Sequence, residues 1–134
     1  MRRLRTAGVV LSSAFALASV NSVTAVATPG EASCAFGLSA PSRAQLGSDA
    51  LLVTATLTPQ RCAGKSQPIR STVCIASSAG RTECHDADGW DTARAFIGPY
   101  VAGEPFTATG SGCYIHGEVA EPVCIAAGPR TLTL

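Results

Sequence analysis

The sequence predicts an all-β domain, an antiparallel β-sandwich of about seven strands. Helical periodicity is nearly absent, and short strand-like runs are separated by clusters of Gly, Pro, Ser and Asp. The chain has 134 residues, 46% of them hydrophobic and 14% charged, which favours one packed domain over a disordered chain. Six cysteines in so short a chain predict that disulfides reinforce a modest core.

The N-terminal segment has the pattern of a secretory signal peptide. Three arginines lie within residues 2–5, residues 8–20 form an apolar run, and Ala25-Val26-Ala27 provides a small-x-small cleavage site. The apolar run is shorter than the roughly 20 residues of a membrane-spanning helix. We therefore expect residues 1–27 to be removed and residues 28–134 to form a single exported domain with no membrane span.

The charge that remains excludes a dedicated nucleic-acid binder. Three of the ten basic residues leave with residues 1–27, so seven basic and nine acidic residues remain, a net charge of −2. A nucleic-acid-binding domain would show a basic face. No cofactor-binding motif occurs, because no Gly-rich loop precedes a helix. We expect a secreted or cell-envelope protein without a cofactor.

The predicted strands follow the chain in a regular order. Residues 51–58 are the clearest, with Leu51, Val53, Ala55 and Leu57 on one face and threonines on the other. Pro59 is expected to end this strand, and any helix is expected to be a single turn near residues 42–46. The predicted strands are 34–40, 51–58, 72–76, 81–85, 93–97, 106–113 and 130–134.

The even number of cysteines predicts three structural disulfides. No C-x-x-C pair occurs, which disfavours a zinc site. One disulfide follows from local geometry: Ser78-Ala79-Gly80 is a three-residue hairpin loop with glycine at the left-handed position. Pairing Ser77 with Arg81 then sets Cys74 opposite Cys84 at a narrow, non-hydrogen-bonded pair. The cysteines are Cys34, Cys62, Cys74, Cys84, Cys113 and Cys124.

Residues 102–109 (AGEPFTAT) resemble the corner and sixth strand of immunoglobulin-like and fibronectin-type domains. In those families a turn rich in Pro or Gly precedes an aromatic residue that opens the strand, and Phe106 takes that position. Such a sandwich implies that four cysteines gather at one end, giving Cys34–Cys62 and Cys113–Cys124. A rival connectivity also stays open, because similar Thr/Ala segments, each followed by cysteines, occur twice in the chain. It pairs Cys62–Cys74, Cys113–Cys124 and Cys34–Cys84.

Two further resemblances concern function. The chain resembles small secreted, cysteine-rich proteins of mycobacteria and related actinobacteria, which carry no assigned catalytic residues. It also looks like the secreted chromophore-binding sandwich proteins of the neocarzinostatin type, which share its size, secretion, disulfides and Gly/Ala/Thr-rich composition. The second resemblance implies a small-ligand carrier.

Three groups of polar residues are candidate sites. Asp86, Asp88 and Asp91 flank Gly89 and offer oxygen ligands for a calcium ion. His85 and His116 are the only histidines and the only candidate bases for a small hydrolase, although no G-x-S-x-G or H-E-x-x-H motif occurs. Residues 114–127 are expected to form a loop stapled by a disulfide. The contact patch predicted in that loop is Tyr114, His116, Glu118 and Glu121.

We expect a non-enzymatic binding module that acts outside the cell as a monomer. The loops at one end of the sandwich are the expected contact surface, and the partner is an extracellular protein or a small ligand. The alternatives are a small-ligand carrier of the neocarzinostatin type and a small secreted hydrolase.

Overall fold

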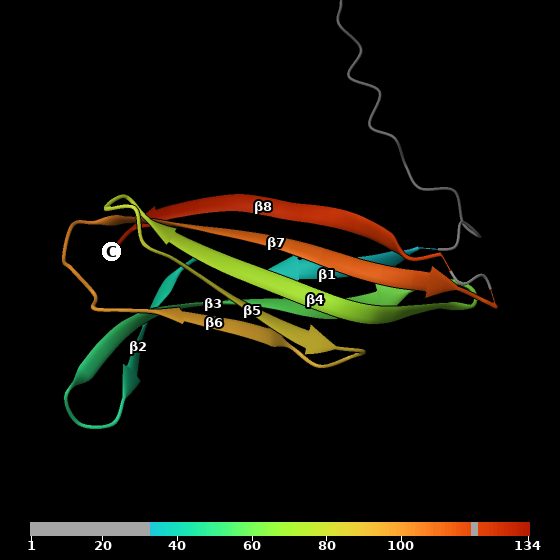
Figure 1. The fold of residues 1–134 in the computed structure, drawn as a ribbon, viewed down its shortest axis with the longest axis horizontal. Helices are drawn as coiled ribbons and strands as arrows, with labels where there is room; N and C mark the ends of the chain where they lie inside the picture. Colours follow the sequence, from blue (N-terminus) through green and yellow to red (C-terminus); the bar gives the residue numbers. More distant parts are fainter. Residues whose placement is uncertain (1–32, 119–120) are drawn as a thin grey trace, which may run out of the picture.

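The computed structural model describes residues 33–118 and 121–134 and confirms an all-β architecture with antiparallel pairing throughout (Figure 1). The predicted signal peptide, residues 1–27, lies outside the described residues. The described chain contains eight strands and no helix, one strand more than expected. The strands are β1 (Cys34–Leu38), β2 (Ser42–Leu46), β3 (Ala50–Cys62), β4 (Ser66–Ser77), β5 (Thr82–Asp88), β6 (Ala93–Ile97), β7 (Pro105–His116) and β8 (Val123–Thr133).

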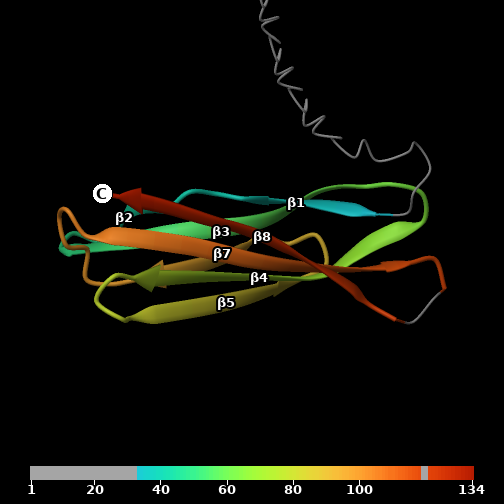
Figure 2. The ribbon, with the colours of Figure 1, turned by 90° about the horizontal axis from the view of Figure 1, so that it is seen from above.

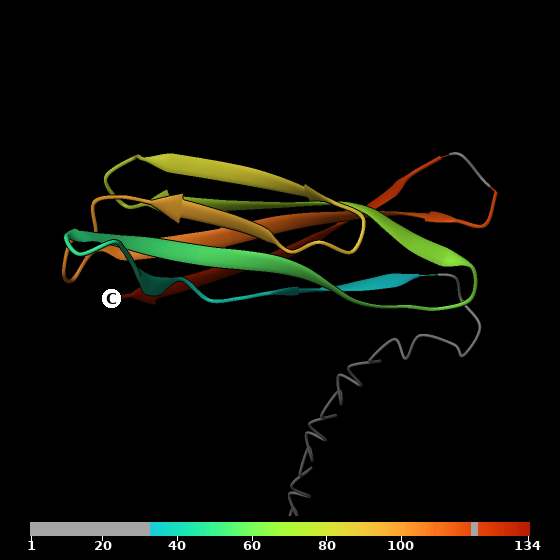
Figure 3. The ribbon, with the colours of Figure 1, turned by 90° about the horizontal axis from the view of Figure 1, so that it is seen from below.

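The eight strands form two four-stranded sheets. In one, β3 pairs with β6 on one side and with both β1 and β2 on the other. The second sheet has the order β5-β4-β7-β8. The strands run along the long axis of the molecule, and β5 and β6 lie side by side along one flank (Figures 1 and 3).

The additional strand, β2, corrects the expectation of a helical turn at residues 42–46. This segment pairs with the first half of β3, from Ser42 opposite Thr54 to Leu46 opposite Ala50. Gly47 has a φ of 71° and closes the hairpin. β3 has 13 residues, and β1 pairs with only its second half. Residues 42–46 therefore form a strand, because the backbone groups in the first half of β3 need hydrogen-bond partners on that side.

Two proline positions also differ from expectation. The strand predicted to end at Pro59 continues to Cys62, and Pro59 lies opposite Phe36 beside a register shift in the β1–β3 ladder. Pro68 likewise lies inside β4 beside an irregularity in the β4–β7 ladder. A bulge accommodates a proline because the ladder locally needs one hydrogen bond fewer.

The core lies between the facing sides of the two sheets. Val53, Ala55 and Leu57 of β3 are almost fully buried, as their alternation predicts, whereas Leu51 at the start of the same face is 40% exposed. Phe106 is the largest fully buried side chain. The core also contains Leu38, Val73, Ile75, Ala93, Ala95, Ile97 and Ala108.

All three disulfides form as expected, and the rival connectivity is wrong. Cys34–Cys62, Cys74–Cys84 and Cys113–Cys124 each join residues directly opposite each other in a ladder, with Cα–Cα distances of 4.0 Å. The predicted hairpin register is also confirmed. The amide of Ser77 donates to the carbonyl of Arg81 at 2.9 Å, and Gly80 has a φ of 88°.

Two glycines on the inner face of β7 make room for side chains from the other sheet. A Cβ atom at Gly112 would lie 2.3 Å from the ring of Phe36, and one at Gly110 would lie 3.0 Å from Leu57. We therefore expect Gly112→Ala to lower the free energy of unfolding by about 1–3 kcal/mol, because the ring must move within a close-packed core. Urea unfolding measures the loss. Thr109→Ala, at an exposed position of the same strand, is the control and is expected to change stability little.

Candidate functional site

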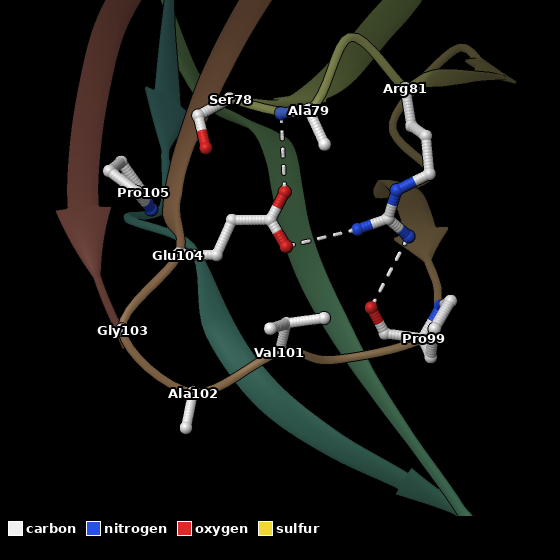
Figure 4. A pocket seen from close by; sticks show the side chains of 9 residues that line it. All are labelled: Ser78, Ala79, Arg81, Pro99, Val101, Ala102, Gly103, Glu104 and Pro105. Carbon is white, nitrogen blue, oxygen red and sulfur yellow. Dashed lines mark hydrogen bonds and ion pairs between the residues drawn. The ribbon is translucent and has the colours of Figure 1, made fainter.

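A hollow of about 600 Å³ is lined by residues of two connecting segments (Figure 4). These segments lie at the end of the sandwich where the C-terminus is found (Figure 1). The hollow lies between the β4–β5 turn and the β6–β7 loop. Its wall is predominantly apolar, and Val101 is 48% exposed there. The lining residues are Ser78, Ala79, Arg81, Pro99, Val101, Ala102, Gly103, Glu104 and Pro105.

An ion pair joins the two segments that line the hollow. Nη2 of Arg81 lies 3.2 Å from Oε2 of Glu104, and the two side chains point toward each other (Figure 4). The Glu104 side chain is 9% exposed and that of Arg81 is 31% exposed. The other carboxylate oxygen of Glu104 accepts a hydrogen bond from the amide of Ala79 at 3.3 Å. Both oxygens of Glu104 are therefore engaged.

The guanidinium of Arg81 also holds the start of the β6–β7 loop. Nη1 donates to the carbonyl oxygen of Gly98 and, at 3.2 Å, to that of Pro99. Further along the loop, the amide of Gly103 donates to the carbonyl of Leu134 at 2.7 Å. These contacts fix the loop to the β4–β5 turn and to the end of the chain, so the hollow has a defined shape without a bound ligand.

The ion pair predicts that neutralising Glu104 lowers the free energy of unfolding more than neutralising Asp88 does. We expect Glu104→Gln to lower the free energy of unfolding by about 1–2 kcal/mol, because it leaves a half-buried guanidinium without its counter-charge. Asp88→Asn is the control, because Asp88 meets Arg70 at 3.6 Å with both side chains more than half exposed. Its loss should stay below about 0.5 kcal/mol. Equal losses in urea unfolding would contradict a special role for Arg81 and Glu104.

The predicted contact patch is only partly exposed. Tyr114 is 8% exposed and faces inward from β7, so it does not belong to an outer contact surface. His116, Glu118 and Glu121 are exposed at the opposite end of the sandwich from the hollow. The expected stapled loop at residues 114–127 is also shorter, because β7 continues to His116 and β8 begins at Val123.

The aspartates proposed as calcium ligands do not form a metal site. Asp86 and Asp88 lie within β5, and Asp91 lies in the turn that follows, where its amide donates to the carbonyl of Asp88. Within residues 33–118 and 121–134, no three His, Cys, Asp or Glu side chains are grouped so that they could hold a metal ion. The acidic segment is better described as a solvated edge strand and turn.

The two histidines lie on different strands, His85 on β5 and His116 at the end of β7. Nδ1 of His116 lies 3.3 Å from the hydroxyl of Ser66, but Ser66, the first residue of β4, is only 6% exposed. His85 is an exposed residue of β5. In the described part of the chain, neither imidazole has an ion pair or hydrogen bond with a carboxylate that would orient it. The Ser66–His116 contact ties β4 to the end of β7.

No family model, curated protein or solved structure matches the chain. In the described residues, no helix has the length and apolar character needed to cross a membrane.

Sequence reasoning missed the hollow because its two walls are far apart in the chain. Arg81 and Glu104 are separated by 23 residues and meet only after β5, β6 and the following loop are in place. The available signals were a lone arginine on the return of the hairpin and a lone glutamate in a loop rich in Gly and Pro.

Proposed function

We propose that the protein is a secreted, non-enzymatic binding module whose partner inserts an apolar group into the hollow beside Arg81 and Glu104. The observation that carries this proposal is the hollow itself. Its volume of about 600 Å³ lies within the range of known ligand sites, roughly 300–1,000 Å³. Three disulfides, which are typical of extracellular proteins, support action outside the cell.

The chemistry of the wall favours an uncharged apolar group. Arg81 and Glu104 neutralise each other, and each carboxylate oxygen of Glu104 already accepts one hydrogen bond from the wall. The surface that remains is formed mainly by Val101, Ala102 and two prolines. Burying this surface against an aliphatic or aromatic group is favourable, whereas a charged group would lose hydration with no counter-charge in return.

The open shape of the hollow favours a protein partner over a carried small molecule. A carrier encloses most of the surface of its ligand, whereas this hollow faces solvent between a turn and a loop (Figure 4). A side chain projecting from another protein fits such a surface as an anchor at the centre of a larger contact. The small-ligand carrier remains the second candidate function because the same wall would also hold a free aromatic molecule.

We also infer that the sandwich is of the immunoglobulin-like or fibronectin-like type. The connections β3–β4, β5–β6 and β6–β7 each pass from one sheet to the other, which is the pattern of a Greek-key sandwich. Loops at the ends of such sandwiches commonly carry binding, because a rigid scaffold holds them in place.

The test uses indole and p-cresol, the side-chain groups of Trp and Tyr, as probes in ¹H–¹⁵N NMR titrations. We expect the shifted amides to cluster at residues 78–81 and 99–105. Val101→Asp should abolish these shifts, because it places a carboxylate on the apolar wall. Trp90→Asp, at an apolar side chain 56% exposed in the β5–β6 turn, should leave them unchanged. Shifts that cluster elsewhere, or that survive Val101→Asp, would contradict the proposal.

A further inference from the structure

The two outer strands of the β5-β4-β7-β8 sheet differ in how they are protected from pairing with other chains. β5 carries Glu83, Asp86 and Asp88, all exposed. Among the described strands, β8 pairs only with β7 (Figures 1 and 2). It extends over 11 residues and carries a single charged residue, Arg130, which donates to the carbonyl of Leu38 at 2.8 Å. Charged side chains are a common means of keeping an edge strand from adding a neighbour, and residues 123–127 of β8 have none.

The first half of β8 presents free backbone groups at this edge. Cys113 and Cys124 form a close cross-strand pair, with Cα atoms 4.0 Å apart, which identifies a non-hydrogen-bonded position of the β7–β8 ladder. The amide and carbonyl of Cys124 therefore point away from β7. Because the direction alternates along a strand, those of Ala126 point the same way, while Val123 and Ile125 bond to β7.

The side chains of this segment are suited to a further strand. Val123 is 47% exposed and Ile125 is 38% exposed, although both lie on the face of the sheet that is directed toward the sandwich interior. In the described part of the chain no strand follows β8 in its sheet, so no neighbouring strand packs against these side chains from that side. No charged residue occurs within residues 123–127, and the disulfide at Cys124 anchors the segment to β7.

We propose that β8 is a self-association edge, at which two copies of the chain pair antiparallel through residues 123–127. A two-fold axis at Ile125 places Cys124 opposite Ala126 of the partner subunit, so the outward-pointing amides and carbonyls of both copies bond to each other. The same register sets Val123 opposite Ala127 of the partner subunit and joins the apolar side chains of both copies.

The sequence of residues 123–127 favours a second copy of the chain as the partner of the β8 edge. Residues 123–127 are complementary to themselves in an antiparallel register, with apolar side chains on one face and small ones on the other. Pairing between two β5 edges would instead bring like charges together. In the pair, the β5-β4-β7-β8 sheets of the two copies join into one continuous sheet. The hollow of each copy stays accessible, because it lies at the opposite end of its sandwich from residues 123–127. This inference replaces the expectation of a monomer and does not depend on the proposed role of the hollow.

Sedimentation equilibrium of residues 28–134 tests the pairing. The concentration range extends to about 1 mM, because a contact this small is expected to be weak. We expect concentration-dependent dimers. Ile125→Lys should abolish them, because two ammonium groups would meet at the axis. Ala126→Pro should also abolish them, because it removes an amide that serves only the partner.

Circular dichroism and urea unfolding check that both variants stay folded, and Glu83→Gln on the β5 edge is the matched control that should leave dimerisation unchanged. If Ile125→Lys fails to fold, Ala126→Pro still decides the matter, because the Ala126 amide points away from β7 and bonds to none of the described residues of its own copy. A chain that stays monomeric throughout the range would overturn the proposal. So would a dimer that is insensitive to Ala126→Pro.

Discussion

Replacing Phe106 by alanine is expected to lower the free energy of unfolding by about 3–5 kcal/mol. Phe106 opens β7, is fully buried, and has the largest volume of the fully buried side chains. Its neighbours in the ladders are Ser77 of β4 and Leu132 of β8, so the backbone on both sides is held by hydrogen bonds and cannot collapse into the space. Truncation therefore combines a lost transfer free energy with the cost of a cavity.

Trp90→Ala is the matched control for Phe106→Ala. Trp90 is also a large aromatic residue, but it is 56% exposed in the turn after β5, so its loss should stay within about 0.5 kcal/mol. Guanidinium unfolding with both m-values close to the parent value gives the comparison directly. A loss below about 1 kcal/mol for Phe106→Ala would show that the core is not centred on β7.

Removing the Cys34–Cys62 disulfide by a double alanine substitution is expected to cost about 3–4 kcal/mol. It closes the longest of the three disulfide loops, with a sequence separation of 28, against 10 and 11 for the other two. It also fixes the first strand to β3 at the point where the described chain begins, and Cys34 is 4% exposed. The entropy of the unfolded chain therefore rises most when this disulfide is absent.

The comparison is the double alanine variant of Cys113 and Cys124. Because this disulfide closes a shorter loop, its removal is expected to lower the free energy of unfolding by only about 2–3 kcal/mol. Both are measured by guanidinium unfolding of the oxidised proteins. A greater loss at Cys113–Cys124 would mean that the β7–β8 hairpin, and not the attachment of β1, governs stability.

Strands with an apolar residue at every second position were predictable from the sequence. Val53, Ala55 and Leu57 bury one face of β3, and Ala93, Ala95 and Ile97 bury one face of β6. The Cys74–Cys84 disulfide was predictable because a three-residue loop ending in Gly80 fixes the register over the few residues that follow.

The errors occurred where tertiary pairing overrides a local signal. Residues 42–46 carry a helix-compatible pattern, yet they form β2 because the first half of β3 needs a neighbour. Pro59 is a stop signal in isolation, but a bulge opposite Phe36 accommodates it. Local propensity alone contains no information on which long strand lacks a partner.

The candidate site was less predictable than the fold. Glycine and proline at positions 98–105 correctly indicate a loop, but they do not show that Glu104 turns inward to meet Arg81. The sequence predicts Tyr114 in an exposed loop, because its mixture of Gly, Ser and Thr residues does not indicate how far β7 extends. The free edge of β8 likewise depends on the order of strands in the sheet.

We propose that this protein is an exported sandwich in which all six cysteines serve as structural disulfides. The most direct test of this proposal is the intact mass of the protein recovered from the medium of a secreting bacterial host, measured with and without reduction and alkylation. We predict a chain beginning at Thr28 that is lighter by six hydrogen atoms, two for each disulfide, and that takes up alkylating agent only after reduction. Retention of residues 1–27 would contradict export, and alkylation before reduction or the added mass of a bound metal would contradict a purely structural role for the cysteines.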